Sequence, residues 1–104
     1  MSEKYEFWGN IFLTKFEVVV ALCDKELIGK RIKTKRFDVK ISKHFYGGNL
    51  VDEELAIKLM EKATIGNLMG KKIVKLARKN GFIDKKNIIL INGIPHAQFV
   101  KIET

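Results

Sequence analysis

Residues 45–81 read FYGGNLVDEELAIKLMEKATIGNLMGKKIVKLARKNG, and the predicted fold is organised around them. Its first half, from Asp52 to Lys62, places apolar residues three and four positions apart, which is the spacing of a helix with one buried face. Asn49 or Asp52 can cap this helix, and the acidic residues of its first turn suit the positive end of the helix dipole. The stretch therefore begins with an amphipathic helix that needs an apolar surface to pack against.

A second helix is predicted from about Ile65 to Lys79, ending at the pair Asn80-Gly81, which suits a left-handed C-cap. Its apolar residues share one face: Ile65, Met69, Ile73 and Leu76. Its basic residues gather on the opposite third of the circumference: Lys71, Lys72, Lys75, Arg78 and Lys79. Gly66 and Gly70 are expected to let this helix pack closely on a sheet. A phosphate cradle is the alternative, but the expected helix lacks the strand-then-loop setting of such sites.

Strand patterns lie on both sides of this stretch. Phe16 to Leu22 is almost continuously apolar, as in a central strand that is covered on both faces. Two short strands are expected around a turn at Gly9-Asn10, and Arg36 to Ile41 alternates as a half-buried strand does. The tail holds two further apolar runs around Asn92-Gly93, which is a strong hairpin signal, although Pro95 argues for a longer, irregular connection.

These elements together predict one α+β domain over residues 1–104, a mainly antiparallel or mixed sheet with two helices packed on one face. A chain of 104 residues is long enough to bury a core without disulfide bonds. The apolar positions that match strand and helix periods are expected to be mostly buried: Val18, Val20, Leu22, Phe37, Val39, Ile41, Leu55, Leu59, Ile73, Leu76 and Ile89.

The composition excludes several classes of protein. No apolar run approaches the ~20 residues of a membrane-spanning helix, and the polar N-terminus does not resemble a signal peptide. The single cysteine, Cys23, rules out an internal disulfide bond and fits a cytoplasmic protein. We expect a buried structural thiol there, with a nucleophile or a ligand as the alternative. Paired ligand spacing is absent, so neither a metal site nor a cofactor is predicted.

The net charge of +8 is the unusual feature of the composition, and it is concentrated in two blocks. The first block lies between Lys30 and Lys43, and the second lies between Lys71 and Lys86. Two basic blocks on one surface attract polyanions, and the residues expected to contact RNA are Lys30, Arg31, Lys33, Lys35, Arg36, Lys71, Lys72, Lys75, Arg78 and Lys79. A lysine-rich solubilising surface is the alternative explanation.

A second candidate site combines a glycine turn with a histidine. Tyr46, Gly47 and Gly48 precede the first helix, and a glycine pair at that position can point backbone N–H groups at an anion. We expect one of the two glycines to take a positive φ and the turn to lie against the loop that holds His96. Gln98 follows at an alternate position and would face the same pocket. A purely conformational turn and a hydrogen-bonding histidine are the simpler explanation.

The sequence resembles a known family in four stretches: Cys23 to Lys30, Phe45 to Gly48, Asn67 to Lys71, and Gly93 to Gln98. This family of small archaeal proteins is known as domain of unknown function 424. The resemblance extends from about Phe16 to Ile102, in order and with similar spacing. It implies an archaeal, cytoplasmic protein of about one domain without an assigned activity, and it transfers no catalytic residue.

Three functions fit these patterns, and no catalytic signature is present. The first is a translation-associated RNA- or ribonucleoprotein-binding module, in which basic side chains neutralise phosphates while Tyr46 and Trp8 stack on unpaired bases. The second is a protein-interaction or self-assembling module that uses the N-terminal aromatic residues Tyr5, Phe7 and Trp8. The third is a small enzyme built on the histidine beside the glycine turn. We expect the first.

Overall fold

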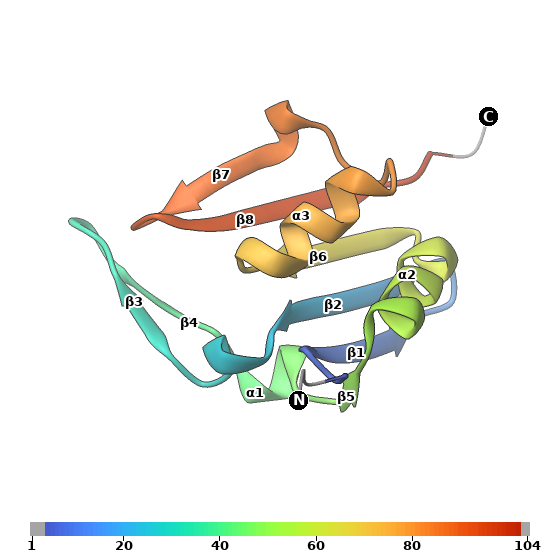
Figure 1. Cartoon of the computed structure of the whole chain (residues 1–104), viewed down its shortest axis with the longest axis horizontal. Helices are drawn as coiled ribbons and strands as arrows, with labels where there is room; N and C mark the ends of the chain where they lie inside the picture. Colours follow the sequence, from blue (N-terminus) through green and yellow to red (C-terminus); the bar gives the residue numbers. More distant parts are fainter. Residues whose placement is uncertain (1–3, 103–104) are drawn as a thin grey trace.

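The computed structural model describes residues 4–102, which fold around one six-stranded sheet (Figure 1). The strand order is β5-β1-β2-β6-β8-β7; β2 pairs with β6 in parallel, and every other neighbouring pair is antiparallel. The strands are β1 (Phe7–Leu13), β2 (Val18–Asp24), β5 (Asn49–Val51), β6 (Ile65–Met69), β7 (Ile88–Ile91) and β8 (Ile94–Val100). This mixed sheet confirms the predicted α+β class.

Two helices cover one face of the sheet, as the sequence predicts. They are α2 (Glu53–Lys62) and α3 (Lys71–Lys79), which lie in front of the central strands in Figure 1. The remaining elements are short: the 3-10 helices η1 (Lys25–Leu27) and η2 (Lys85–Asn87), the helix α1 (Lys43–Tyr46), and a separate hairpin of β3 (Arg31–Lys33) and β4 (Asp38–Lys40). Within residues 4–102, no helix is long and apolar enough to cross a membrane.

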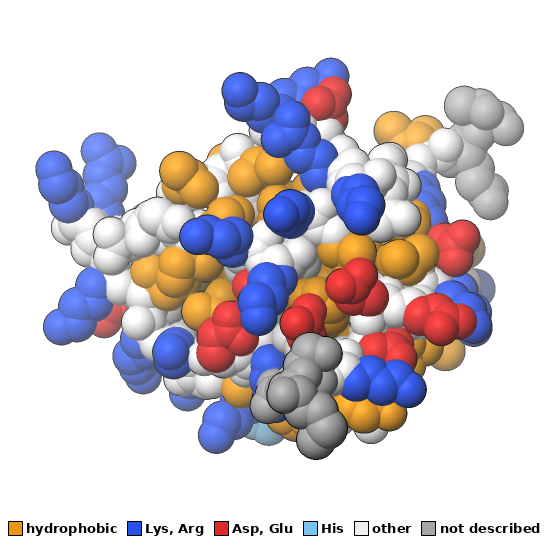
Figure 2. All heavy atoms as spheres, in the orientation of Figure 1, with side chains coloured by type: hydrophobic (Ala, Val, Ile, Leu, Met, Phe, Trp, Pro, Cys, Tyr) orange, Lys and Arg blue, Asp and Glu red, His pale blue; other side chains and the backbone are white. Residues whose placement is uncertain are grey.

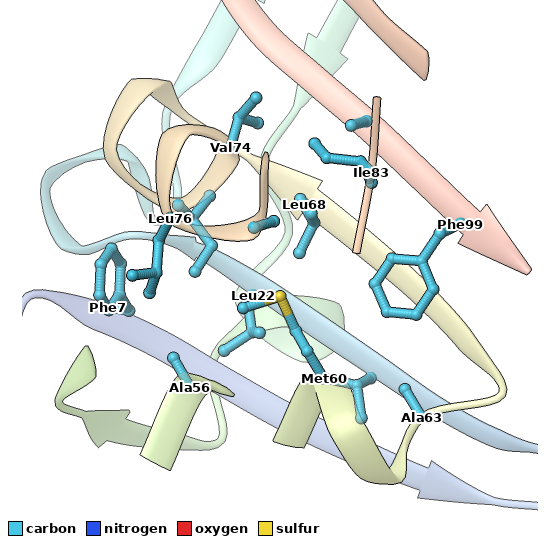
Figure 3. Packing of buried hydrophobic residues seen from close by; sticks show 14 of the residues in the cluster. Phe7, Leu22, Ala56, Met60, Ala63, Leu68, Val74, Leu76, Ile83 and Phe99 are labelled. Atoms are coloured by element: carbon cyan, nitrogen blue, oxygen red, sulfur yellow. The ribbon is translucent and has the colours of Figure 1, made fainter. Parts of the chain in front are cut away.

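The main core lies between the two helices and the sheet (Figure 3). In Figure 3, Ala56 and Met60 point from α2 towards Leu22 of the central strand β2, and Leu76 of α3 points to the same layer. Burying a leucine- or isoleucine-sized side chain contributes about 1.5–3 kcal/mol. This layer therefore holds α2 and α3 in place on the sheet.

The opposite face of the sheet carries a smaller core at one end. There, Ile32 and Ile41 of the hairpin region and Tyr46 of α1 cover Cys23 and Met69 of the sheet. The central strand is thus covered on both faces along this part of its length, as predicted. Cys23 is fully buried, and burial raises the pKa of its thiol to about 12. The structural interpretation of this cysteine is confirmed.

The second helix begins at Lys71 and not at Ile65, so the predicted start is wrong. Residues Ile65–Met69 form strand β6 between β2 and β8, and Gly70 follows with a φ of +123°. Ile65 and Met69 are four positions apart, a spacing that places two residues on the same side of a helix and also of a strand. The apolar pattern alone therefore does not separate the two structures here.

The predicted turn at Gly9-Asn10 is also wrong, because β1 runs through both residues. A Cβ at Gly9 would lie 2.9 Å from the Leu22 side chain. Glycine is therefore present to make room for the core and not to reverse the chain. Phe7–Leu13 consequently forms one continuous strand, which pairs with β2 over its whole length.

The tail forms a tight hairpin in place of the longer connection that Pro95 suggested. Asn92 and Gly93 have φ values of 47° and 83°, and they alone join β7 to β8. Positive φ at both central residues is the conformation that a two-residue hairpin favours. Pro95 and His96 therefore lie within β8, and the expectation that His96 occupies a loop is wrong.

Most of the expected core residues are buried or half-buried, but Phe37, Leu55 and Ile89 are 60%, 44% and 57% exposed. Phe37 lies in the turn before β4, so the alternation of that strand does not extend to it. Ile89 lies on the edge strand β7, which has a neighbour on one side only. Leu55 lies in the first turn of α2, at the margin of the buried face that Ala56 and Met60 form.

Candidate nucleic-acid interface

Helix α3 separates apolar from basic side chains. Its buried residues face the sheet: Ile73, Val74, Leu76 and Ala77. Its basic residues are all exposed: Lys71, Lys72, Lys75, Arg78 and Lys79. We name these five residues the α3 basic face. The angular spacing in the sequence predicts this separation, because the two sets differ in their position on the helix circumference.

The N-terminus of α3 is capped by Asp24, the last residue of β2. The Asp24 carboxylate accepts hydrogen bonds from the backbone N–H groups of Lys72 at 2.9 Å and Ile73 at 2.8 Å. Burial raises the pKa of this carboxyl above its ordinary value, although the two N–H donors oppose the rise. Lys71 and Lys72 stand at the positive end of the helix dipole, where a lysine is unfavourable. Helix stability therefore does not explain why lysines occupy this turn.

A groove with a volume of about 450 Å³ lies between α3 and the β7–β8 hairpin. Its lining combines four basic and three apolar side chains: Lys71, Lys75, Arg78 and Lys79 with Val74, Ile88 and Pro95. We name this feature the α3 groove. It offers cations to phosphate groups and apolar surface to the less polar parts of the same ligand.

The other side of α3 is electrostatically mixed. A hollow of about 350 Å³ is lined there by Lys72, Lys75 and Lys79 together with the acidic Glu6 and Glu53. The Nζ atom of Lys72 lies 4.0 Å from Oε1 of Glu6. Because these carboxylates offset the lysines, the α3 groove is the more positive of the two depressions.

The first basic block forms the β3–β4 hairpin and the residues around it. All five predicted contact residues of this block are exposed: Lys30, Arg31, Lys33, Lys35 and Arg36. The hairpin projects beyond the main sheet at the left of Figure 1. Figure 2 shows basic side chains at the hairpin tip and over α3 on the same side of the molecule, with apolar side chains between them.

The two halves of the candidate glycine–histidine pocket are separated. Gly48 lies beside β1, where an added Cβ would be 2.6 Å from the Gly9 carbonyl oxygen. His96 and Gln98 lie on β8, three strands from β1 in the sheet, which is about 14 Å at the usual strand spacing. Neither Gly47 nor Gly48 takes the expected positive φ. The Gly48 position needs glycine because of the close approach to Gly9.

The side chains of the candidate pocket have separate surroundings. Tyr46 is only 6% exposed, and burial together with the neighbouring Cys23 raises the pKa of its hydroxyl to about 12. Its ring therefore has no free face on which a base could stack, contrary to our expectation. His96 is half-buried, with Nδ1 2.9 Å from the Leu68 carbonyl oxygen, and Gln98 is exposed on the same strand.

The apolar lining of the α3 groove is what sequence reasoning missed. Val74, Ile88 and Pro95 come from a helix and from two strands, and no periodicity places those segments together. The pair Asn92-Gly93 could nevertheless have indicated part of this lining, because it is typical of a two-residue hairpin turn. Interpreting that pair as a two-residue turn brings Ile88 and Pro95 to neighbouring strands of one hairpin.

Residues 13–102 match a family model described as a protein of unknown function (DUF424). The chain belongs to this family. The matched region begins at the end of β1 and includes the β3–β4 hairpin, α3 and the β7–β8 hairpin. All the residues that form the α3 groove and the first basic block thus lie within the DUF424 region.

A solved structure has a similar fold. It is the crystal structure of an uncharacterized conserved protein from the archaeon Methanopyrus kandleri, with a TM-score of 0.79 and 28% sequence identity. The similarity covers 94% of this chain and 95% of that chain. No curated protein matches the sequence. These similarities agree with the archaeal family that the four sequence stretches resemble.

Proposed function

We propose that this member of the DUF424 family is an RNA- or ribonucleoprotein-binding module of the cytoplasm, associated with translation and without catalytic activity of its own. The observation that carries the proposal is the α3 groove, in which four basic side chains surround apolar surface. The contact residues are the α3 basic face together with Lys30, Arg31, Lys33, Lys35 and Arg36. The free, buried thiol of Cys23 suits a reducing compartment.

The chemistry of the groove favours RNA as the ligand. Phosphates supply a repeated negative charge that Lys71, Lys75 and Arg78 neutralise along one side of α3. Bases and riboses supply less polar surface that can contact Ile88 and Pro95. The two lysines in the first turn of α3 reduce helix stability slightly, and a polyanion bound there removes that cost.

The proposal is tested by reversing the charges of Lys71, Lys75 and Arg78 together to Glu. We expect the wild type to bind a fluorescent oligo-uridine of about 20 nucleotides with a slope of log affinity against log salt of roughly −0.7 per phosphate contacted. Removing three contacts should make that slope about 2 units less steep. The three side chains are exposed, so circular dichroism and the melting temperature should change little. Fluorescence anisotropy at graded salt gives the slope.

The matched control reverses Lys15, Lys58 and Lys62, which changes the net charge equally. Lys15 lies in the turn between β1 and β2, and Lys58 and Lys62 lie on α2. Lys58 also loses an exposed ion pair with Glu54 at 3.5 Å, which is worth at most about 0.5 kcal/mol. Equal weakening by both triple variants would show that net charge alone matters and would refute the groove as the contact surface. Binding that ignores salt would refute it as well.

Self-assembly is the second candidate function, and the edge strand β7 favours it. Ile89 and Leu90 are 57% and 68% exposed, and the sequence holds no lysine, arginine, aspartate or glutamate from Asn87 to Val100. An unprotected edge of this kind can pair with a strand of another chain. The expected use of Phe7 does not apply, because Phe7 is buried. Failure to bind RNA at low salt, with a concentration-dependent dimer in sedimentation, would favour this function.

A further inference from the structure

The side chain of Phe37 is exposed to solvent at the tip of the β3–β4 hairpin. Its backbone is fixed by Thr34: the Phe37 N–H donates to Thr34 Oγ1 at 3.1 Å, and the Phe37 carbonyl oxygen accepts from Thr34 Oγ1 at 2.6 Å and from the Thr34 N–H at 3.0 Å. The ring is nevertheless 60% exposed. A turn that is ordered on three hydrogen bonds thus presents an aromatic side chain to solvent.

The hairpin does not need this ring for its own packing. Ile32, on the strand before the turn, is buried at 5% exposure, and Val39, on the strand after it, packs against the same small core. These two side chains attach the hairpin to the sheet. Phe37 is therefore free to contact a partner, and its replacement should leave the fold unchanged.

The charges around Phe37 indicate the chemistry of that partner. Six basic residues and one acidic residue occur from position 30 to position 40: Lys30, Arg31, Lys33, Lys35, Arg36 and Lys40 against Asp38. An aromatic ring among cations suits a nucleic acid, whose bases stack on the ring while its phosphates meet the cations. Phe16 is 81% exposed, but it lies between Lys15 and Glu17 in another turn, without a basic block.

We propose that Phe37 stacks on an unpaired base of single-stranded RNA, while Lys33, Lys35 and Arg36 contact the adjoining phosphates. This inference rests on the proposed RNA-binding function and specifies its substrate class. Bases in an RNA duplex are stacked on one another and present no free face, so the ring selects single-stranded RNA. Phe37 takes the role that the sequence suggested for Tyr46, whose ring is buried.

The test compares Phe37→Ala with Phe16→Ala on two probes, an oligo-uridine of about 20 nucleotides and inorganic polyphosphate, which has charges but no bases. We expect Phe37→Ala to weaken binding of oligo-uridine by about 5- to 150-fold, the usual range for losing one stacked base, and to leave polyphosphate binding unchanged. Phe37→Leu should weaken oligo-uridine binding as well, whereas Phe37→Trp should bind oligo-uridine about as tightly as the wild type does. Phe16→Ala should change neither affinity.

Three results would overturn the stacking role while the proposed function stands. The first is equal oligo-uridine affinity of the wild type and Phe37→Ala with the salt dependence intact. The second is an equal loss of affinity for polyphosphate, which would assign the ring a role in hairpin structure. The third is tighter binding of the wild type to an RNA duplex of the same length than to oligo-uridine. A wild type that binds no oligo-uridine at low salt contradicts the proposed function itself, and the stacking role falls with it.

Discussion

Gly70→Ala tests the strand-to-helix junction. The predicted long helix implies that this substitution stabilises the protein, whereas the observed structure implies that it destabilises the protein. Within a helix from Ile65 to Lys79, alanine in place of glycine would stabilise the protein by about 0.8–1 kcal/mol. In the structure, Gly70 has φ +123° and ψ 156° and precedes α3. That backbone conformation is almost restricted to glycine, and another residue there loses about 1–3 kcal/mol.

The added methyl group also collides with the cap of α3. A Cβ at Gly70 would lie 2.6 Å from Oδ2 of Asp24, the atom that accepts the Lys72 N–H. Moving the Asp24 carboxylate away weakens the cap, and losing a helix cap costs about 0.5–2 kcal/mol. The two effects together predict that Gly70→Ala lowers the free energy of unfolding by about 1.5–5 kcal/mol.

The measurement is urea unfolding followed by circular dichroism, with Gly81→Ala as the control. Gly81 also has a positive φ, +81°, but no heavy atom lies within 4 Å of its Cβ position. Its replacement therefore incurs only the backbone cost of about 1–2 kcal/mol. Gly70→Ala must be clearly the more damaging of the two. A gain in stability, or a loss no larger than that of Gly81→Ala, would refute the cap at this junction.

Two further predictions concern the cores on the two faces of the sheet. Ile73→Ala should lower the free energy of unfolding by about 2–5 kcal/mol, because this residue of α3 is fully buried; a loss below about 0.5 kcal/mol in urea unfolding would remove it from the core. The Cys23 thiol should resist a thiol reagent in the native protein and react once the protein is unfolded. The pKa of the Cys23 thiol is about 12 in the folded protein, above the ordinary value of 9.0. Because the folded protein holds this proton more tightly than the unfolded chain does, the contribution of the thiol to the free energy of unfolding is complete below about pH 9 and is lost as pH rises towards 12. Cys23→Ala should remove that part of the pH dependence, and an unchanged pH profile would contradict it.

Features that depend on local periodicity could be predicted from the sequence. The α3 basic face follows from the positions of its lysines and arginine along the helix, because each residue of a helix turns the side chain by a constant angle. The C-terminal end of α3 and the cap of α2 at Asp52 also follow from residues within one turn. The apolar run of β2 predicted a central strand, because only a strand covered on both faces needs apolar residues on both sides.

Which elements cover which residues could not be predicted from the sequence, because it depends on contacts between distant segments. Ile65–Met69 is a strand because β2 and β8 supply backbone hydrogen-bonding partners on its two sides, and those partners lie far away in the sequence. Tyr46 is buried because α1 folds onto the sheet, whereas Phe37 is exposed because the hairpin carries it past the edge. The α3 groove likewise exists only once the β7–β8 hairpin lies beside α3. Burial depends on these long-range neighbours, and therefore it cannot be predicted from the spacing of residues along one segment.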